Sequence, residues 1–202
     1  MNKVCILDYG SGNVRSVFNL FNSVVNCCVS NALPDIEDAT HIVLPGVGAF
    51  GAAMQKIRTV LPIDQIERVV VQNGKPFLGI CVGMQVLAER GSEFGDHAGL
   101  GWIHGTVDRL QSGILPLPHI GWNNIAREIA HPLFDELGED PDFYFLHSYA
   151  LRNNTGKILA TAEFGEVFCA AIAQDNILGV QFHPEKSLRA GLKLITNFLA
   201  LS

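Results

Sequence analysis

The sequence predicts an α/β protein: a mostly parallel open sheet with helices on both faces and a nucleophile elbow, plus an antiparallel β extension in the second half. Short apolar runs typical of buried strands alternate with helical spacing before about residue 100. After about residue 100, the sequence consists of short β-like runs separated by turn residues. The 202 residues are 48% hydrophobic and 17% charged, which is typical of a globular chain with a substantial core.

Strands and helices alternate in the first half. Residues 4–7 form an apolar run typical of a strand buried on both faces, and apolar residues recur at helical spacing over 14–25. A second strand is expected at 41–44, a helix at 63–71 and a third strand at 76–80. This order predicts parallel strands joined by right-handed crossovers.

The second half predicts the antiparallel extension and then a return to the central sheet. The β-like runs are residues 102–110, 143–149, 158–164 and 167–173. A buried strand at 177–182 and an amphipathic helix at 188–199 close the chain. Since repeats, low-complexity segments and linkers are absent from the sequence, we expect one domain over residues 1–202.

Charge and cysteine content exclude several classes of protein. The net charge of −6 is scattered and no run of Lys or Arg stands out, so neither nucleic acid nor a membrane surface is an expected partner. No apolar run approaches the roughly 20 residues of a membrane span, and we expect a cytoplasmic protein. An odd number of cysteines without a Cys-x-x-Cys pair argues against a disulfide framework and a zinc site: Cys5, Cys27, Cys28, Cys81 and Cys169. We expect no metal and no cofactor.

One cysteine has the setting of a nucleophile. Gly79-Ile80-Cys81-Val82-Gly83 follows a predicted strand and precedes a helical pattern, which is the form of a nucleophile elbow. A helix N-terminus at this point would favour the thiolate of Cys81. The alternative interpretation is an inert buried cysteine between glycines that are needed for packing.

A histidine and an acid follow another buried strand. Of the seven histidines, only His183 directly follows a core strand and is joined through a proline to an acid, Glu185. The C-terminal ends of parallel strands meet at one edge of a sheet, where Cys81 is also expected. His183 is therefore the predicted general base and Glu185 its orienting partner. A single histidine in such a position can also be structural.

Acyl transfer also needs donors for an oxyanion. The N–H of Val82 is one candidate. Pro45-Gly46-Val47-Gly48 ends another strand, and its glycines allow the N–H of Val47 to turn toward the same oxygen.

A glycine-rich segment near the N-terminus offers a different interpretation. Asp8 to Arg15 resembles the start of a dinucleotide fingerprint, but Arg15 occupies the place of the third glycine. A plain strand-to-helix turn is the favoured interpretation.

Together these motifs resemble the class I (triad) glutamine amidotransferases, whose signatures match Gly79 to Gln85 and His183-Pro184-Glu185. Within that family the chain looks like the glutaminase subunits of imidazole glycerol phosphate synthases. The motifs that narrow the resemblance are Asp8 to Asn13, Pro45 to Phe50, Pro118 to Asn123, Tyr144 to Tyr149 and Gly179 to Ser187.

The resemblance implies hydrolysis of L-glutamine to glutamate and ammonia. It implies a heterodimer with a cyclase/synthase subunit of TIM-barrel type, which uses the ammonia to make imidazole glycerol phosphate and AICAR in histidine biosynthesis. The residues implied for the glutamine pocket are Gly48, Gln85, His147, Ser148 and Tyr149. The candidates for the partner interface are Asn13, Trp122, Tyr144 and Lys186.

Two departures from the family pattern leave alternatives open. Pro116 stands where the family often has a basic residue, and Ile120 replaces a methionine. A paralogous glutaminase subunit feeding a different synthase, such as one that amidinates a surface sugar, is therefore the alternative function. A cysteine hydrolase or chaperone-like relative without an ammonia-using partner, and a non-catalytic regulatory subunit, are further alternatives.

Overall fold

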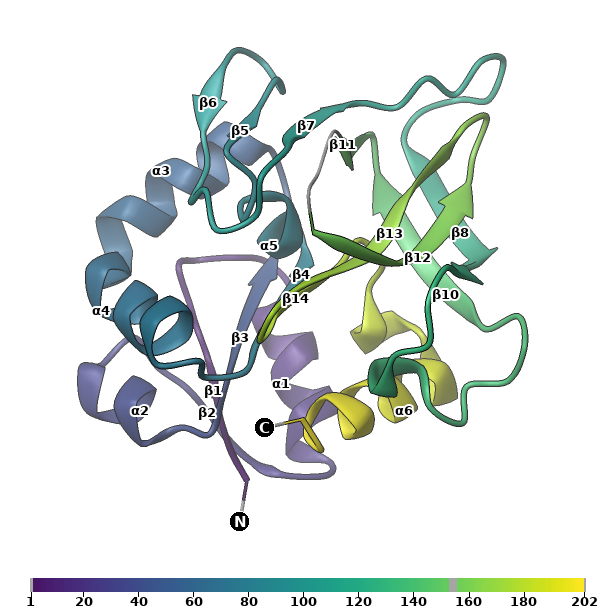
Figure 1. Ribbon diagram of the computed structural model, residues 1–202. Helices are drawn as coiled ribbons and strands as arrows, with labels where there is room; N and C mark the ends of the chain where they lie inside the picture. Colours follow the sequence, from purple (N-terminus) through teal and green to yellow (C-terminus); the bar gives the residue numbers. More distant parts are fainter. Residues whose placement is uncertain (1, 153–155, 202) are drawn as a thin grey trace.

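The computed structural model describes residues 2–152 and 156–201 and contains the predicted parallel sheet (Figure 1). The order in its eight-stranded sheet is β2-β1-β3-β4-β14-β13-β12-β9. The parallel strands are β2 (Asn26–Val29), β1 (Lys3–Ile6), β3 (His41–Gly46), β4 (Phe77–Cys81) and β14 (Ile177–Val180). The antiparallel strands are β13 (Val167–Gln174), β12 (Lys157–Glu163) and β9 (Ala126–Arg127).

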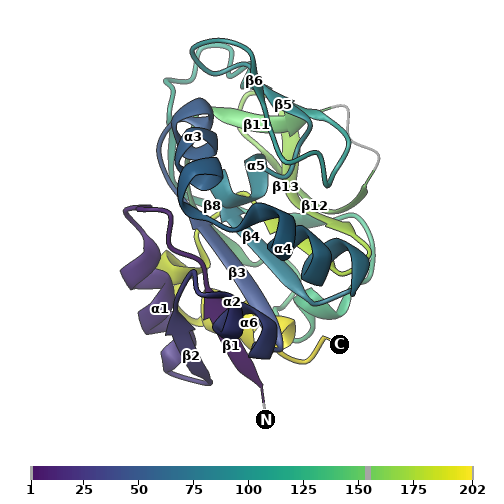
Figure 2. The same cartoon turned by 90° about the vertical axis from the view of Figure 1, so that its left-hand side faces the viewer.

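Helices cover both faces of this sheet, as predicted. On one face lie α1 (Val14–Asn22) and α6 (Leu188–Phe198), and on the other lie α2 (Leu33–Asp38), α3 (Phe50–Val60) and α4 (Ile63–Glu67) (Figures 1 and 2). The helix expected at 63–71 is α4 continued by a π-helical turn, Arg68–Gln72. Strand β2 and helices α2 and α3 are additional elements that the sequence pattern had not indicated.

The predicted antiparallel extension is only partly separate: β13, β12 and β9 continue the central sheet, and the remaining strands form two further sheets. Strand β10 (Asp142–His147) pairs with β8 (His119–Asn124), and β11 (Tyr149–Arg152) pairs with β7 (Thr106–Arg109). The short strands β5 (Arg90–Gly91) and β6 (His97–Ala98) complete the second of these sheets. The expected strand over 102–110 is shorter than predicted, because Gly101 and Gly105 take positive φ angles of 70° and 139° and turn the chain before β7.

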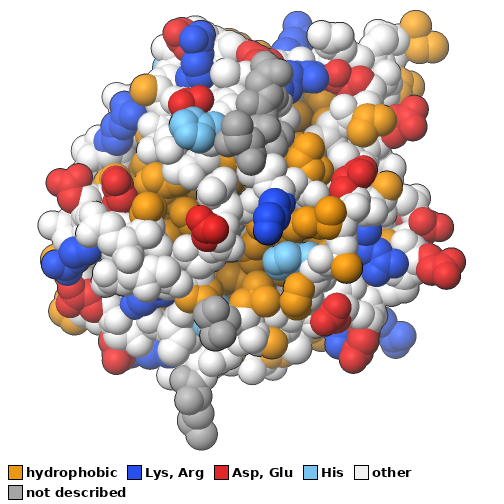
Figure 3. Space-filling model, in the orientation of Figure 1, with side chains coloured by type: hydrophobic (Ala, Val, Ile, Leu, Met, Phe, Trp, Pro, Cys, Tyr) orange, Lys and Arg blue, Asp and Glu red, His pale blue; other side chains and the backbone are white. Residues whose placement is uncertain are grey.

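The surface agrees with the charge pattern of the sequence. In the view of Figure 3, Lys and Arg alternate with Asp and Glu, and apolar side chains gather in a recessed area near the middle of the face. Among the described residues, no helix is long and apolar enough to cross a membrane.

Glycines allow the helix that follows β4 to lie directly against the sheet. This helix, α5 (Val82–Gln85), begins at the residue after Cys81. A methyl group added at Gly83 would lie 1.9 Å from the carbonyl oxygen of Leu44 in β3, and one at Gly79 would lie 2.5 Å from that of Gly83. Both approaches are too close for any side chain, so the two glycines fix how the elbow packs.

We expect Gly83→Ala to destabilise the protein by at least about 3 kcal/mol, since the added methyl group meets backbone that cannot move aside. The measurement is the free energy of unfolding in denaturant. Gly113→Ala is the control for backbone strain without a clash: unlike Gly83, Gly113 takes a positive φ, but it has open space where the methyl group would lie, so this change should cost only about 1–2 kcal/mol. Equal losses in the two variants would contradict the packing argument.

Candidate active site

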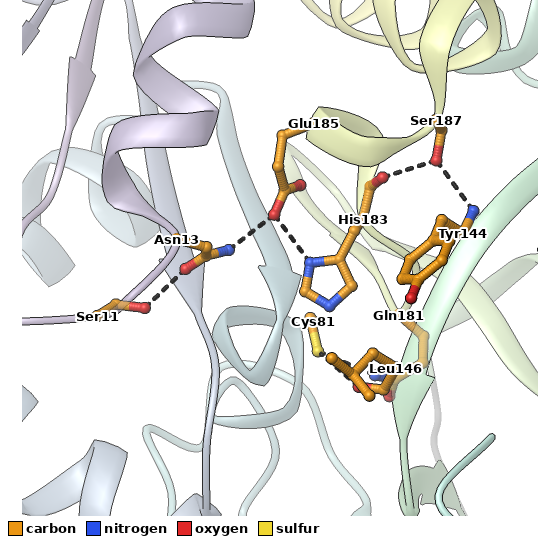
Figure 4. Close-up of polar contacts among 9 residues, drawn as sticks. All are labelled: Ser11, Asn13, Cys81, Tyr144, Leu146, Gln181, His183, Glu185 and Ser187. Carbon is orange, nitrogen blue, oxygen red and sulfur yellow. Dashed lines mark hydrogen bonds and ion pairs between the residues drawn. The ribbon is translucent and has the colours of Figure 1, made fainter. Parts of the chain in front are cut away.

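The elbow holds Cys81 in a strained backbone conformation. Its φ and ψ are 54° and −111°, an arrangement that a non-glycine residue adopts only under constraint. The thiol is buried and lies 3.8 Å from the carbonyl oxygen of Leu146 and 3.7 Å from the amide nitrogen of Gln181 (Figure 4). Because the strand ends abruptly here, the sulfur is raised above the C-terminal edge of the sheet.

His183 and Glu185 lie at the same edge, just beyond β14. The Nδ1 atom of His183 is 2.8 Å from Oε1 of Glu185, and both side chains are fully buried. Figure 4 shows the opposite edge of the imidazole ring turned toward Cys81. Nε2 of His183 has no hydrogen-bond partner in the described part of the chain, and neither has Oε2 of Glu185. The three residues singled out in the sequence are therefore brought together, with one imidazole nitrogen left available.

Asn13 holds the carboxylate from the other side. Its amide nitrogen donates to Oε1 of Glu185 at 3.0 Å, and Ser11 Oγ donates to the Asn13 side-chain oxygen at 2.7 Å (Figure 4). The glycine-rich loop between β1 and α1 thus supplies a residue that orients Glu185. Asn13 is buried, so its side chain is not displayed on the surface in the way expected for an interface residue.

The electrostatics of the cluster favour a charged imidazole. Burial disfavours the imidazolium, but the negative charge of the nearby Cys81 sulfur, together with the hydrogen bond and charge of Glu185, outweighs it and raises the pKa of His183 to about 10. For Glu185, burial disfavours the carboxylate, yet the hydrogen bond and charge of His183 lower its pKa below the usual value. The arrangement therefore favours an imidazolium on His183 paired with a carboxylate on Glu185.

A pocket opens beside the thiol. Its empty volume, which includes space open to solvent, is about 380 Å³. All five residues expected for the glutamine pocket line it, as do Val47 and Val82. The full lining is Val47, Gly48, Cys81, Val82, Gln85, Glu93, Leu146, His147, Ser148 and Tyr149.

Glu93 is a pocket residue that the sequence reasoning missed. One of its carboxylate oxygens, Oε2, accepts a hydrogen bond from the backbone N–H of Phe50 at the start of α3, at 2.9 Å. It lies between β5 and β6 in an irregular segment without a recognisable motif. The only signal in the sequence is an acid within a glycine-rich turn, Gly91 to Gly95, which is too common to indicate a site.

Polar contacts fix the wall of the pocket. The carbonyl oxygen of Tyr149 accepts hydrogen bonds from Gln85 Nε2 at 2.9 Å and from His147 Nδ1 at 3.0 Å. Gln85 Nε2 also donates to Gln181 at 3.0 Å, so its amide nitrogen is fully used and only its oxygen remains for a ligand. The segment from His147 to Tyr149 is therefore anchored to the elbow helix.

The other three interface candidates form one exposed cluster. The rings of Trp122 and Tyr144 meet edge to face with centroids 6.1 Å apart, and the Lys186 ammonium lies 5.2 Å from the centroid of the Tyr144 ring. Trp122 is 50% exposed, so it does not belong to the core. Over the described ranges, no group of three or more His, Cys, Asp or Glu side chains has the arrangement of a metal site.

Known proteins place this fold and site in one family. Residues 6–201 match the family model described as glutamine amidotransferase class-I. The chain is 45% identical to imidazole glycerol phosphate synthase subunit HisH of Zymomonas mobilis, covering 97% of this chain and 94% of the relative. It is 44% identical to imidazole glycerol phosphate synthase subunit HisH 2 of Vibrio vulnificus, covering 98% and 94%.

Solved structures agree at the level of the fold. A structure described as PurLQS from Thermotoga maritima matches with a TM-score of 0.76 at 18% identity, covering 98% of each chain. A crystal structure of a glutamine amidotransferase matches with a TM-score of 0.75 at 20% identity, covering 98% of this chain and 97% of the other. The chain belongs to the class I glutamine amidotransferases.

Proposed function

We propose that the chain is the glutaminase subunit of an imidazole glycerol phosphate synthase, hydrolysing L-glutamine and supplying ammonia to a partner in histidine biosynthesis. The observation that carries this proposal is the buried Cys81, His183 and Glu185 cluster beside a pocket whose lining includes Cys81 itself. The 45% identical Zymomonas mobilis relative, named as a subunit of that synthase, supports the choice of pathway. In this proposal residues 1–202 act as one cytoplasmic glutaminase domain that needs neither metal nor cofactor.

The first half-reaction forms a thioester. The thiolate of Cys81 attacks the side-chain amide carbon of glutamine, and the negative charge moves to the amide oxygen, which the N–H groups of Val47 and Val82 stabilise. His183 then transfers a proton from Nε2 to the departing nitrogen, and ammonia leaves as the C–N bond breaks. The unpaired Nε2 atom is the group required for this step.

The second half-reaction releases glutamate. His183 accepts a proton from water as the water oxygen attacks the thioester carbon, and the C–S bond breaks to restore the thiolate. Glu185 keeps the proton on Nδ1 and balances the imidazolium, as the acidic member of a triad does. Asn13 in turn holds Glu185 in place.

The pocket residues bind the amino-acid end of the substrate. Glu93 is the one carboxylate among the residues that line the pocket, so we assign it to the α-ammonium group of glutamine. Gly48, Gln85, His147, Ser148 and Tyr149 supply the remaining polar and backbone contacts.

Partner docking is assigned to the exposed cluster of Trp122, Tyr144 and Lys186. Large amphipathic rings are common anchors in interfaces, and these lie beside the triad rather than on a remote face. The partner we propose is a cyclase subunit of TIM-barrel type, forming a heterodimer. Because unused ammonia is wasted, we expect the isolated chain to be a poor glutaminase that the partner activates.

A paralogous role stays a second candidate. The Vibrio vulnificus relative carries the numeral 2 in its name, as expected where one organism has two such subunits. Pro116 and Ile120 depart from the family pattern, and Ile120 lies on β8 two residues before Trp122 of the proposed docking cluster. Adding purified cyclase partners of the two kinds separately, and measuring glutamate release with each, separates the histidine enzyme from a synthase that amidinates a sugar.

We expect Cys81→Ala to reduce glutamate release to the background rate while leaving the fold and partner binding intact, since Cys81 is the only proposed nucleophile. The measurement is glutamate release in the presence of the partner. Cys169→Ala is the control, because that thiol is also buried but bonds to the carbonyl of Ala171, away from the pocket. Substantial turnover by Cys81→Ala would rule out the mechanism.

The pKa of His183 should fall in the Cys81→Ala variant. The charge of Cys81 is the largest of the influences that raise this pKa to about 10. Without it, only Glu185 is left to stabilise the imidazolium against the effect of burial. NMR titration of the ring in the wild type and in the variant measures the change, and Cys169→Ala should leave the value unaltered. An identical pKa in Cys81→Ala would mean that the sulfur carries no charge near His183.

We expect Lys186→Ala to lower the activation of the glutaminase by its partner about tenfold, because the ammonium belongs to the docking cluster and adjoins Glu185 in the chain. The measured quantity is the ratio of glutamate release with and without the partner. Lys193→Ala is the control, since Lys193 lies on α6 and pairs with Glu136. A lone chain that is already fully active would contradict both this prediction and the proposed regulation.

A further inference from the structure

Two histidines that the proposed reaction does not use form a continuous chain of hydrogen bonds to the pocket wall. Nδ1 of His119 lies 3.0 Å from Nε2 of His147, and Nδ1 of His147 lies 3.0 Å from the carbonyl oxygen of Tyr149. The amide nitrogen of Asn123 lies 3.3 Å from Nε2 of His119. Both histidines are buried and face each other as partners in the β8–β10 ladder.

The acceptor at one end of the chain, the Tyr149 carbonyl, and the donor at the other, the Asn123 amide, determine where every proton lies. The Tyr149 carbonyl can only accept, so Nδ1 of His147 carries a proton, and in the neutral ring Nε2 must then accept from His119. His119 therefore also carries its proton on Nδ1 and accepts from Asn123 at Nε2. Asn123 is oriented for this because its amide nitrogen also donates to the carbonyl oxygen of Glu163, at 2.9 Å.

The surroundings hold the first ring of this chain in one orientation. The His119 ring is stacked between Phe164 and Phe145, with centroid distances of 4.1 and 4.9 Å and an interplanar angle of 20° to each. Stacking fixes the plane of the ring, and the hydrogen bonds to His147 and Asn123 select the orientation in which Nδ1 faces His147. The result is a fixed donor directed at a residue that lines the pocket.

Resting on the proposed glutaminase function, we propose that His119 is a positioning residue: its Nδ1–H fixes His147, and through it the Tyr149 carbonyl, in the geometry that binds glutamine. Gln85 holds the same carbonyl from the elbow helix. The pocket wall from His147 to Tyr149 is thereby fixed from two elements, α5 and β8. Without His119, Nε2 of His147 would be a buried acceptor with no donor, and the wall would move to satisfy it.

The chain also stays uncharged beside the triad. Burial lowers the pKa of His119 to about 4, and burial together with the neighbouring His119 and His183 lowers that of His147 to about 3. A second imidazolium here would oppose the charge that His183 carries. Neutral histidines provide directional hydrogen bonds without that repulsion.

Two substitutions separate the hydrogen bond from the packing. His119→Phe keeps an aromatic ring between Phe145 and Phe164 but removes the donor. His119→Asn loses the ring but places an amide N–H near the position of Nδ1. His41→Phe is the control for loss of a buried histidine, since His41 bonds to Leu201 and packs on Phe198, away from the pocket.

The measurement is the rate at which a glutamine-analogue chloroketone labels Cys81 in the isolated chain, compared with the rate for iodoacetamide. We expect His119→Phe to slow the chloroketone about tenfold and to change the iodoacetamide rate less than twofold. His119→Asn should stay within about threefold of the wild type, and His41→Phe should match it. Unchanged chloroketone labelling in His119→Phe, or a loss confined to His119→Asn, would overturn the proposal.

Two further readouts keep the proposal testable. Nitrogen-15 NMR of the wild type should show both His119 and His147 as neutral rings protonated on Nδ1, and a proton on Nε2 of His147 would overturn it even if a variant fails to fold. If the wild-type chain reacts no faster with the glutamine analogue than with a chloroketone lacking the glutamine side chain, the proposed function itself fails. By contrast, if the wild type reacts selectively and the His119→Phe variant reacts just as the wild type does, only the positioning role of His119 fails.

Discussion

The close backbone contact between β3 and α5 is the constraint on which the rest of the site depends. Only a residue without a side chain fits at Gly83, because an added methyl group would lie 1.9 Å from the carbonyl oxygen of Leu44. This close contact holds Cys81 in its strained turn. The strain lifts the sulfur out of the sheet toward His183. It also starts α5 immediately after the thiol, so that Gln85 reaches the pocket wall. A looser junction would supply neither the raised sulfur nor the anchored wall.

Burying the His183 and Glu185 pair is costly, and the structure offsets that cost only in part. Taking both groups out of water penalises their charged forms, while their mutual hydrogen bond and the one from Asn13 to Glu185 favour them. Two polar atoms stay unpaired, Nε2 of His183 and Oε2 of Glu185. Nε2 is the atom that the proposed mechanism uses. The residual instability is therefore located where proton transfer occurs.

The sequence predicts the central sheet, the elbow and the His-Pro-Glu turn because each depends on neighbouring residues. Cys81 between glycines and His183 after a buried strand are local patterns, and parallel strands bring them to one edge. Helix α3 was missed although Phe50, Ala53, Met54 and Ile57 have helical spacing, because glycines and a proline just before it suggested only a loop. The roles of Asn13 and Glu93 depend on contacts across 172 and 43 residues, respectively. No spacing rule encodes such pairs.

The triad and the proposed docking cluster share one piece of backbone. The N–H of His183 donates to the carbonyl oxygen of Tyr144 at 2.8 Å, and Ser187 Oγ bonds both to the carbonyl of His183 and to the N–H of Tyr144. Strand β10 is therefore tied directly to the turn that carries His183, the proposed general base (Figure 4). One face of β8 and β10 displays Trp122 and Tyr144, and its other face carries the histidine chain to the pocket. A partner that shifts β8 and β10 would therefore affect His183 and the pocket wall at His147 together, because both are hydrogen-bonded to these two strands.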